Sequence, residues 1–127
     1  MSASAPIILL TDRNPNVREL LKREFEVEGY QVRLARDARE LCAGLESATP
    51  DLVVLDMDAP YLGERAVQDR LLRVSMAAPV VLHVFSLEEL QHPLVALAAA
   101  QVEKSADLTT LKTVVRRLLA AALRESA

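Results

Sequence analysis

The sequence contains no tryptophan, one cysteine and three glycines, and aromatic residues make up only 3% of its 127 residues. So few aromatic side chains leave few platforms on which single-stranded nucleic acid could stack. The single cysteine, Cys42, falls at a core position of a predicted amphipathic helix, where a small thiol serves packing. With so few glycines, the sequence lacks the glycine-rich loop that binds phosphate after a first strand.

Long apolar runs and an excess of basic residues are also absent. No apolar run approaches the roughly 20 residues needed to span a bilayer, so the sequence excludes a membrane span. The first residues, Met1 to Ala5, lack the basic start of a signal peptide, and we expect a cytoplasmic protein. The net charge of −3 argues against direct binding to a nucleic-acid backbone.

The length is that of one domain with its own apolar core. We predict a single domain over residues 1–127, with an ordered core at about residues 6–123. No linker or low-complexity tract divides the chain between its two ends.

Five short apolar runs alternate with segments of helical spacing. The runs predict strands at residues 7–11, 30–35, 52–55, 80–84 and 100–103. Asn14 and Gly29 are typical of the start and stop of the first helix, and Asp107 of the start of the last. Pro93 interrupts the fourth helical segment, where a helix should end, kink or restart. The alternation predicts a doubly wound five-stranded parallel sheet flanked by five helices, an α/β fold.

Charged residues stand at the ends of three predicted strands. Asp12 follows the first strand, Asp56 the third and Lys104 the fifth. Ligands bind at the carboxyl edge of open parallel sheets. An acidic residue at this edge is therefore a better candidate for a functional residue than an acidic residue on a helix face. We expect the three side chains to converge on one charged cluster.

Two segments carry a resemblance to a known family. In residues 8–21 a strand ends at an acid just before the first helix, and in residues 50–60 an apolar strand ends at Asp56. Both resemble the receiver domain of bacterial two-component response regulators, and Lys104 matches the lysine after that family's fifth strand. The resemblance covers essentially the whole chain and implies a chemotaxis-type receiver with a flavodoxin-like fold, acting in phosphorelay signal transduction.

The resemblance also implies roles for the matched residues. Asp56 would accept a phosphoryl group from a histidine kinase or phosphotransfer protein, and Lys104 would contact the phosphate. Asp12 and Asp56 would hold Mg²⁺, to which Asp58 could add a carboxylate, although aspartate also favours turns for its own backbone bonding. Such a domain acts through a downstream protein partner or output domain. It is no enzyme beyond phosphorylating and dephosphorylating its own aspartate.

Four positions depart from the family pattern. Arg13 stands in place of a second acid, Val84 in place of a hydroxyl residue, Gln101 in place of an aromatic switch residue and Ser105 in place of a proline. Arg13 adds positive charge where the metal would bind, so we expect Mg²⁺ binding to be weakened or absent. Val84 and Gln101 remove both moving parts of the family's conformational readout.

The side chain of Arg13 has two placements that the sequence leaves open. Folded inward, it would pair with Asp56 or Asp12, imitate the cation and lower the pKa of the acceptor. Pointed to solvent, it would leave a loosened metal site to which Asp58 could contribute.

Two other functions stay open beside the phosphorylated receiver. The four departures together favour an atypical pseudo-receiver, a protein interaction module of the same fold that works without phosphorylation. A small flavodoxin-like nucleotide- or flavin-binding protein is the other alternative, although residues 12–15 do not form a phosphate loop.

Overall fold

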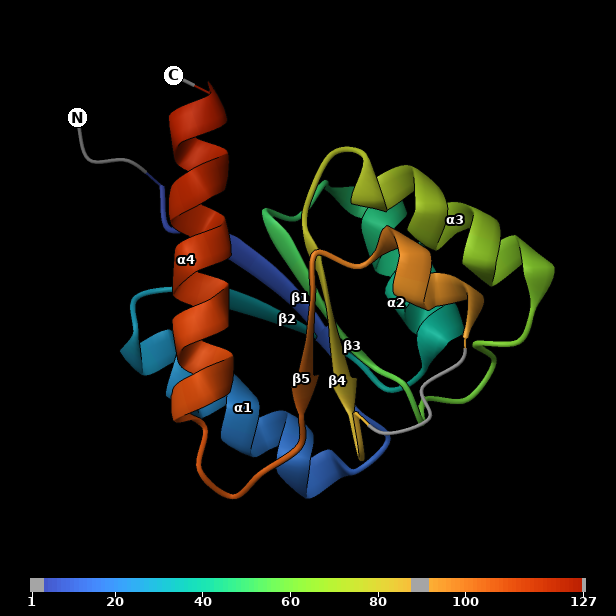
Figure 1. Cartoon of the computed structure of the whole chain (residues 1–127), viewed down its shortest axis with the longest axis horizontal. Coiled ribbons are helices and arrows are strands. Elements are labelled where there is room, and N and C mark those ends of the chain that lie inside the picture. The colour runs from blue at the N-terminus through green and yellow to red at the C-terminus, as the bar shows by residue number, and fades with distance from the viewer. Residues whose placement is uncertain (1–3, 88–91, 127) are drawn as a thin grey trace.

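The chain folds into a parallel sheet with strand order β2-β1-β3-β4-β5 and helices on both faces (Figure 1). This computed structural model describes residues 4–87 and 92–126. The strands are β1 (Ile7–Thr11), β2 (Gln31–Ala35), β3 (Leu52–Asp56), β4 (Val80–Val84) and β5 (Ala100–Glu103). All four pairings are parallel. The predicted doubly wound parallel sheet is confirmed, and its strands agree with the predicted ranges to within one residue.

Polar side chains fix where the helices begin. The α-helices are α1 (Pro15–Val27), α2 (Ala38–Ser47), α3 (Arg65–Ser75) and α4 (Thr109–Ser126). The side chain of Asn14 accepts two backbone N–H groups at the start of α1, and Gly29 follows its end with a φ of 95°. Asp107 accepts the N–H of the first residue of α4 at 2.9 Å. These three positions match the sequence prediction.

The prediction of five flanking helices is wrong between β4 and β5. The described residues there contain a short 3₁₀-helix, η1 (Pro93–Leu97), in place of a fourth α-helix. Pro93 starts η1 because a proline lacks only an N–H that a first turn leaves unpaired. At Ala98 the backbone returns to an extended conformation. Residues 88–91, which belong to the same predicted helical segment, lie outside the described residues.

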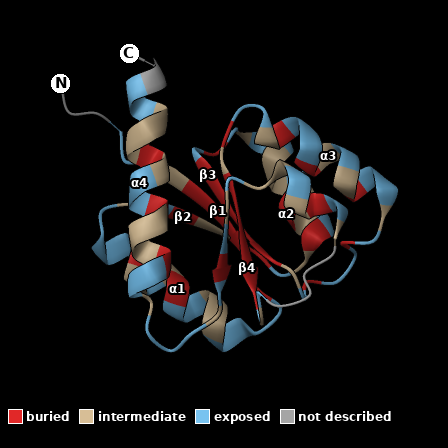
Figure 2. Cartoon of the chain, viewed as in Figure 1, coloured by how far each residue is buried: buried red, intermediate tan, exposed pale blue. Residues whose placement is uncertain are grey.

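The sheet is covered on both faces and separates two apolar cores (Figure 2). Side chains of α2, α3 and η1 pack on one face, and those of α1 and α4 pack on the other. Along β4, Leu82 belongs to the first core and Val81 to the second, as the alternation of a strand requires. Every residue of β3 and β4 is buried. The residues at the carboxyl ends of these two strands are therefore held in place by packing on both faces of the sheet.

None of the helices in the described residues is both long enough and apolar enough to cross a membrane.

Candidate functional site

Three charged residues meet at the carboxyl edge of the sheet, as the sequence predicts. Asp12 follows β1 directly, Asp56 is the last residue of β3, and Lys104 follows β5 directly. β1 and β3 are neighbours, whereas β4 lies between β3 and β5. Lys104 continues the pairing of β5, because its backbone N–H donates to the carbonyl of Val84 at the end of β4. Its long side chain then spans the width of β4 to reach Asp56.

The carboxylate of Asp56 has no solvent exposure and is held by three donors. Its Oδ1 accepts the ammonium of Lys104 at 2.6 Å and the backbone N–H of Asp58 at 2.9 Å. Its Oδ2 accepts the backbone N–H of Arg13, also at 2.9 Å. Three donors, one of them charged, offset the cost of keeping a carboxylate ionised in the interior.

Asp12 contributes a second buried carboxylate with one oxygen left free. It is 2% exposed, and its Oδ1 accepts the backbone N–H of Asn14 at 2.8 Å. Its Oδ2 is buried without a hydrogen-bond partner in the described residues, although the ammonium of Lys104 lies 3.5 Å away. Such an oxygen beside a second carboxylate is the kind of ligand that Mg²⁺ prefers.

Asp58 lies at the rim of this cluster. Its side chain is 43% exposed, and its Oδ2 is 3.7 Å from the ammonium of Lys104. One cation therefore faces three carboxylates, those of Asp12, Asp56 and Asp58. Burial alone would lower the pKa of Lys104, but the hydrogen bond to Asp56 and the three negative charges outweigh burial and raise it.

The structure decides between the two placements of Arg13. Arg13 is exposed, and its side chain forms no ion pair with Asp12 or Asp56 in the part of the chain that the structure describes. Only its backbone N–H reaches Asp56. Arg13 therefore points to solvent at the mouth of the site, where its charge acts on the cluster from outside.

Comparison with known proteins identifies the family. The pattern described as "Response regulator receiver domain" matches residues 8–116. The chain belongs to this family. Among curated relatives of this receiver domain, the response regulator MprA of Mycolicibacterium vanbaalenii is 46% identical over 55 residues, which are 43% of this chain and 24% of MprA. Protein PetR of Rhodobacter capsulatus is 40% identical over 86 residues, covering 65% of this chain and 34% of PetR.

Solved structures of receiver proteins match over most of the chain. The response regulator TrrA of Thermotoga maritima, in complex with Mg²⁺ and BeF, has a TM-score of 0.79 and 30% identity, covering 89% of this chain and 98% of TrrA. TrrA in complex with the histidine kinase ThkA has a TM-score of 0.78 and 31% identity, covering 90% and 98%. By contrast, the chain spans only about a quarter to a third of the length of MprA and PetR.

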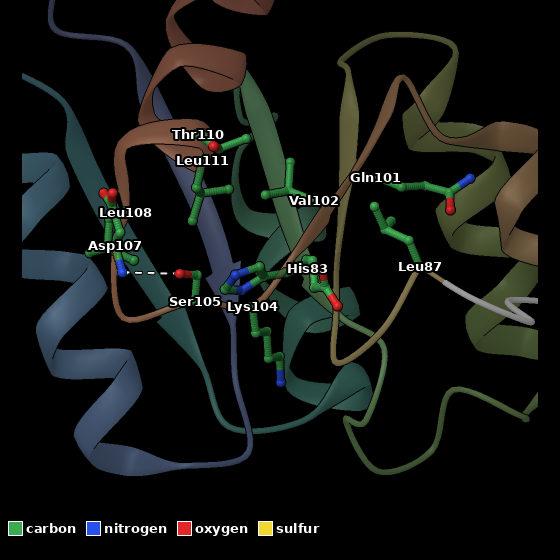
Figure 3. Close-up of a pocket in the computed structure, with 11 residues that line it drawn as sticks. His83, Leu87, Gln101, Val102, Lys104, Ser105, Asp107, Leu108, Thr110 and Leu111 are labelled. Carbon is green, nitrogen blue, oxygen red and sulfur yellow. Dashed lines mark hydrogen bonds between the residues drawn. The ribbon is translucent and has the colours of Figure 1, made fainter.

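Besides Arg13, the structure also places the other residues singled out from the sequence. Val84 is 1% exposed and packs in the core beneath α2 and α3. Gln101 is exposed on β5 and lines an open pocket of about 420 Å³ at the start of α4 (Figure 3). Ser105 lines the same pocket, and its hydroxyl accepts the N–H of Asp107 at 3.1 Å. In Figure 3 the ammonium of Lys104 extends away from the other labelled side chains.

His83 is a further titratable group at this edge. It is 3% exposed on β4, lines the pocket of Figure 3, and its Nδ1 is buried without a hydrogen-bond partner in the described residues. Burial, and then the charge of Lys104, lower the pKa of His83 against the opposing charges of Asp12 and Asp56. It is therefore a neutral neighbour of the cluster at pH 7.

Arg18 is the site residue that sequence reasoning missed. It lies on the first turn of α1, and its guanidinium donates to the carbonyl of Asp12 at 2.8 Å. A lone arginine at a helical position is typical of a solvated face, so only its position six residues after Asp12 could have drawn attention to it.

Proposed function

We propose that this receiver domain accepts a phosphoryl group on Asp56 from a phosphohistidine of a histidine kinase or phosphotransfer protein. The observation that carries the proposal is the buried carboxylate of Asp56, held by Lys104 at 2.6 Å beside the free carboxylate oxygen of Asp12. A carboxylate is a poor nucleophile toward an anionic phosphoryl group, so transfer depends on fixed position and on charge neutralisation. Both requirements are built into this cluster.

In the proposed reaction an oxygen of Asp56 forms a bond to phosphorus as the bond from phosphorus to the imidazole nitrogen breaks. The leaving nitrogen keeps the electron pair of that bond. The backbone N–H groups of Arg13 and Asp58 hold the carboxylate in a fixed orientation. Lys104 sits where it can move from the carboxylate to an oxygen of the incoming group, and its raised pKa keeps it charged.

The residues present fit a Mg²⁺ ion. Asp12 and Asp56 would hold it together with water, because no three acids in the described residues, Asp58 included, form a group that could hold a metal ion. The structural reason is Oδ2 of Asp12, a buried carboxylate oxygen that accepts no hydrogen bond in the described residues and has only the ammonium of Lys104, at 3.5 Å, as a counter-charge. When bound, the ion would neutralise charge on the phosphoryl oxygens. The exposed charge of Arg13 opposes its binding and weakens its affinity without closing the site.

Mass spectrometry of the intact protein tests this function. The protein is incubated with Mg²⁺ and acetyl phosphate beside two variants, Asp56→Asn and Arg13→Asp. A phosphoryl adduct on the wild type that is missing from Asp56→Asn supports the proposal. An adduct on Arg13→Asp alone would mean that Arg13 silences the site.

That second outcome would favour a phosphorylation-independent interaction module. One observation supports this alternative: Val84 fills a closed core position where the family's hydroxyl would respond to phosphate. A module of this kind would bind its protein partner equally well with Asp56 or with Asp56→Asn. The phosphorylated receiver requires a difference between the two.

The nucleotide- or flavin-binding alternative has no such support. A phosphate at the start of α1 would need free backbone N–H groups. Those of Arg13 and Asn14 are already bound by Asp56 and Asp12. We therefore assign the chain no cofactor of this class.

Signalling through this domain requires further proteins. TrrA forms a complex with the histidine kinase ThkA, and a kinase of that class is the phosphodonor we propose here. MprA and PetR extend well beyond the matched segment, so a downstream partner or an attached output domain would carry the response. We propose a cytoplasmic signalling role in which the only chemistry is formation and hydrolysis of the acyl phosphate on Asp56.

A further inference from the structure

One peptide group connects Arg18 to the carboxylate of Asp56. The carbonyl of Asp12 accepts a hydrogen bond from Nη1 of Arg18 at 2.8 Å. The N–H of Arg13 belongs to the same peptide group and donates to Oδ2 of Asp56 at 2.9 Å. The guanidinium, the peptide and the carboxylate therefore form a continuous hydrogen-bonded chain from α1 to β3.

Arg18 directs its charge only to this loop. It is half-buried, and no carboxylate lies within ion-pair distance of it in the described residues. Its other acceptor is the carbonyl of Arg13, at 3.5 Å. An arginine that loses part of its hydration without an acidic partner has to be satisfied by these carbonyls.

We propose that Arg18 is a positioning residue for the acceptor carboxylate and acts through the peptide group between Asp12 and Arg13. The inference rests on the proposed function for its consequence in phosphorylation. A positive charge on the carbonyl side polarises the peptide and makes its N–H a stronger donor. It also fixes the plane of the peptide, which aims that N–H at Oδ2 of Asp56.

The same contact orients the metal-binding acid. Asp12 carries the carbonyl that Arg18 holds and the carboxylate whose Oδ2 is free. Because Arg13 has removed the second acid of the family pattern, this chain relies more heavily on the orientation of Asp12. Arg18 therefore compensates in part for Arg13.

The shape of the side chain matters as well as its charge. The guanidinium of Arg18 is planar and presents its N–H donors in fixed directions, whereas the ammonium of a lysine is a compact point charge. Arg18→Lys keeps the positive charge but loses the planar guanidinium and its fixed N–H donors. Arg18→Gln loses the charge and most of the reach.

The experiment compares these two variants with Arg23→Gln, a matched control. Arg23 lies on the same helix, is exposed, and makes no hydrogen bond or ion pair within the described residues. Nuclear magnetic resonance of the unphosphorylated protein follows the amide proton of Arg13. Mass spectrometry follows the rate of Asp56 phosphorylation by acetyl phosphate.

We expect Arg18→Gln to move the Arg13 amide proton upfield, the direction of a weaker hydrogen bond, and to slow phosphorylation about tenfold, close to 1.4 kcal/mol in the barrier. Arg18→Lys should give a smaller change in both, and Arg23→Gln should change neither. An unchanged Arg13 amide and an unchanged rate in Arg18→Gln would overturn the proposal. A slower rate in Arg18→Gln with an unchanged Arg13 amide would also overturn the peptide route, because the effect on the rate would then not pass through that N–H.

The amide measurement does not depend on phosphorylation. If the wild type takes no phosphoryl group while the Arg13 amide still responds to Arg18→Gln, the proposed function fails and the positioning contact stands. If Arg18→Gln does not fold, the Arg18→Lys comparison decides in the same way.

Discussion

The ammonium of Lys104 lies 2.6 Å from Oδ1 of Asp56, a carboxylate without solvent exposure. The two residues come from strands that are not neighbours, because β4 separates β3 from β5. The contact therefore joins the middle of the sheet to its edge strand. Lys104 is also the only cation among the three hydrogen-bond donors that hold this carboxylate in the described residues.

Replacing this cation should destabilise the fold. We expect Lys104→Met to lower the free energy of unfolding by about 3 kcal/mol at pH 7, because removing one partner leaves a buried charge uncompensated. Urea denaturation followed by circular dichroism measures the change. In an Asp56→Asn background the same substitution should cost less than about 1 kcal/mol, because the amide carries no charge. Equal losses in both backgrounds would mean that the ammonium of Lys104 stabilises the fold through Asp12 and Asp58 and not through Asp56.

The buried imidazole of His83 should make stability depend on pH. Burial and the charge of Lys104 lower its pKa in the folded state, so the unfolded state binds the proton more readily. Stability from this group is therefore complete above the unfolded pKa of about 6.5 and falls as the pH decreases through that value. We expect a slope of up to about 1.4 kcal/mol per pH unit between pH 7 and 5.

Urea denaturation of the wild type and of His83→Phe, in the presence of a chelator and at several pH values, distinguishes the contribution of His83 from that of the other titratable groups. His83→Phe keeps an apolar ring and cannot titrate, so its stability should vary less than that of the wild type over the same range. Parallel pH profiles for the two proteins would assign the acid loss to the carboxylates instead.

The elements that support the site could be predicted because the sequence pattern and the packing agree. A strand in the middle of a parallel sheet covered on both faces needs an almost continuous apolar run, and β1, β3 and β4 have one, whereas the edge strands β2 and β5 alternate apolar and polar residues. The polar residue that ends a run then falls at the carboxyl edge. The sequence therefore predicts Asp12, Asp56 and Lys104 at this edge.

Side-chain direction and tertiary contacts could not be predicted in this way. Both placements of Arg13 satisfy the sequence, and only the surrounding structure sends its side chain to solvent. The contact between Arg18 and the carbonyl of Asp12 depends on how α1 lies over the end of β1. Periodicity also missed the shortening of the fourth helix to η1, because Pro93 allows an end, a kink or a restart alike.

Removing the charge of Arg13 should strengthen Mg²⁺ binding. Arg13→Asp reverses the charge at the mouth of the site, and we expect the dissociation constant to fall about tenfold at low ionic strength. Arg13→Ala should fall between this variant and the wild type. Titration calorimetry with MgCl₂ measures all three. Because the side chain is exposed, neither variant should change the free energy of unfolding by more than about 0.5 kcal/mol. Identical Mg²⁺ affinities in the three proteins would mean that the charge of Arg13 does not influence metal binding.

The conformational response to a phosphoryl group should be confined to the cluster. With Mg²⁺ and beryllofluoride bound, we expect the backbone amide signals of Asp58 and Lys104 to move and that of Gln101 to stay, because Val84 offers no hydroxyl to link the two regions. The double variant Val84→Thr with Gln101→Tyr should extend the response to position 101. Its buried hydroxyl lacks a partner without the ligand, so the variant should lose about 1 kcal/mol of stability. A large shift at Gln101 in the wild type would mean that this receiver transmits the signal by a route that needs no hydroxyl.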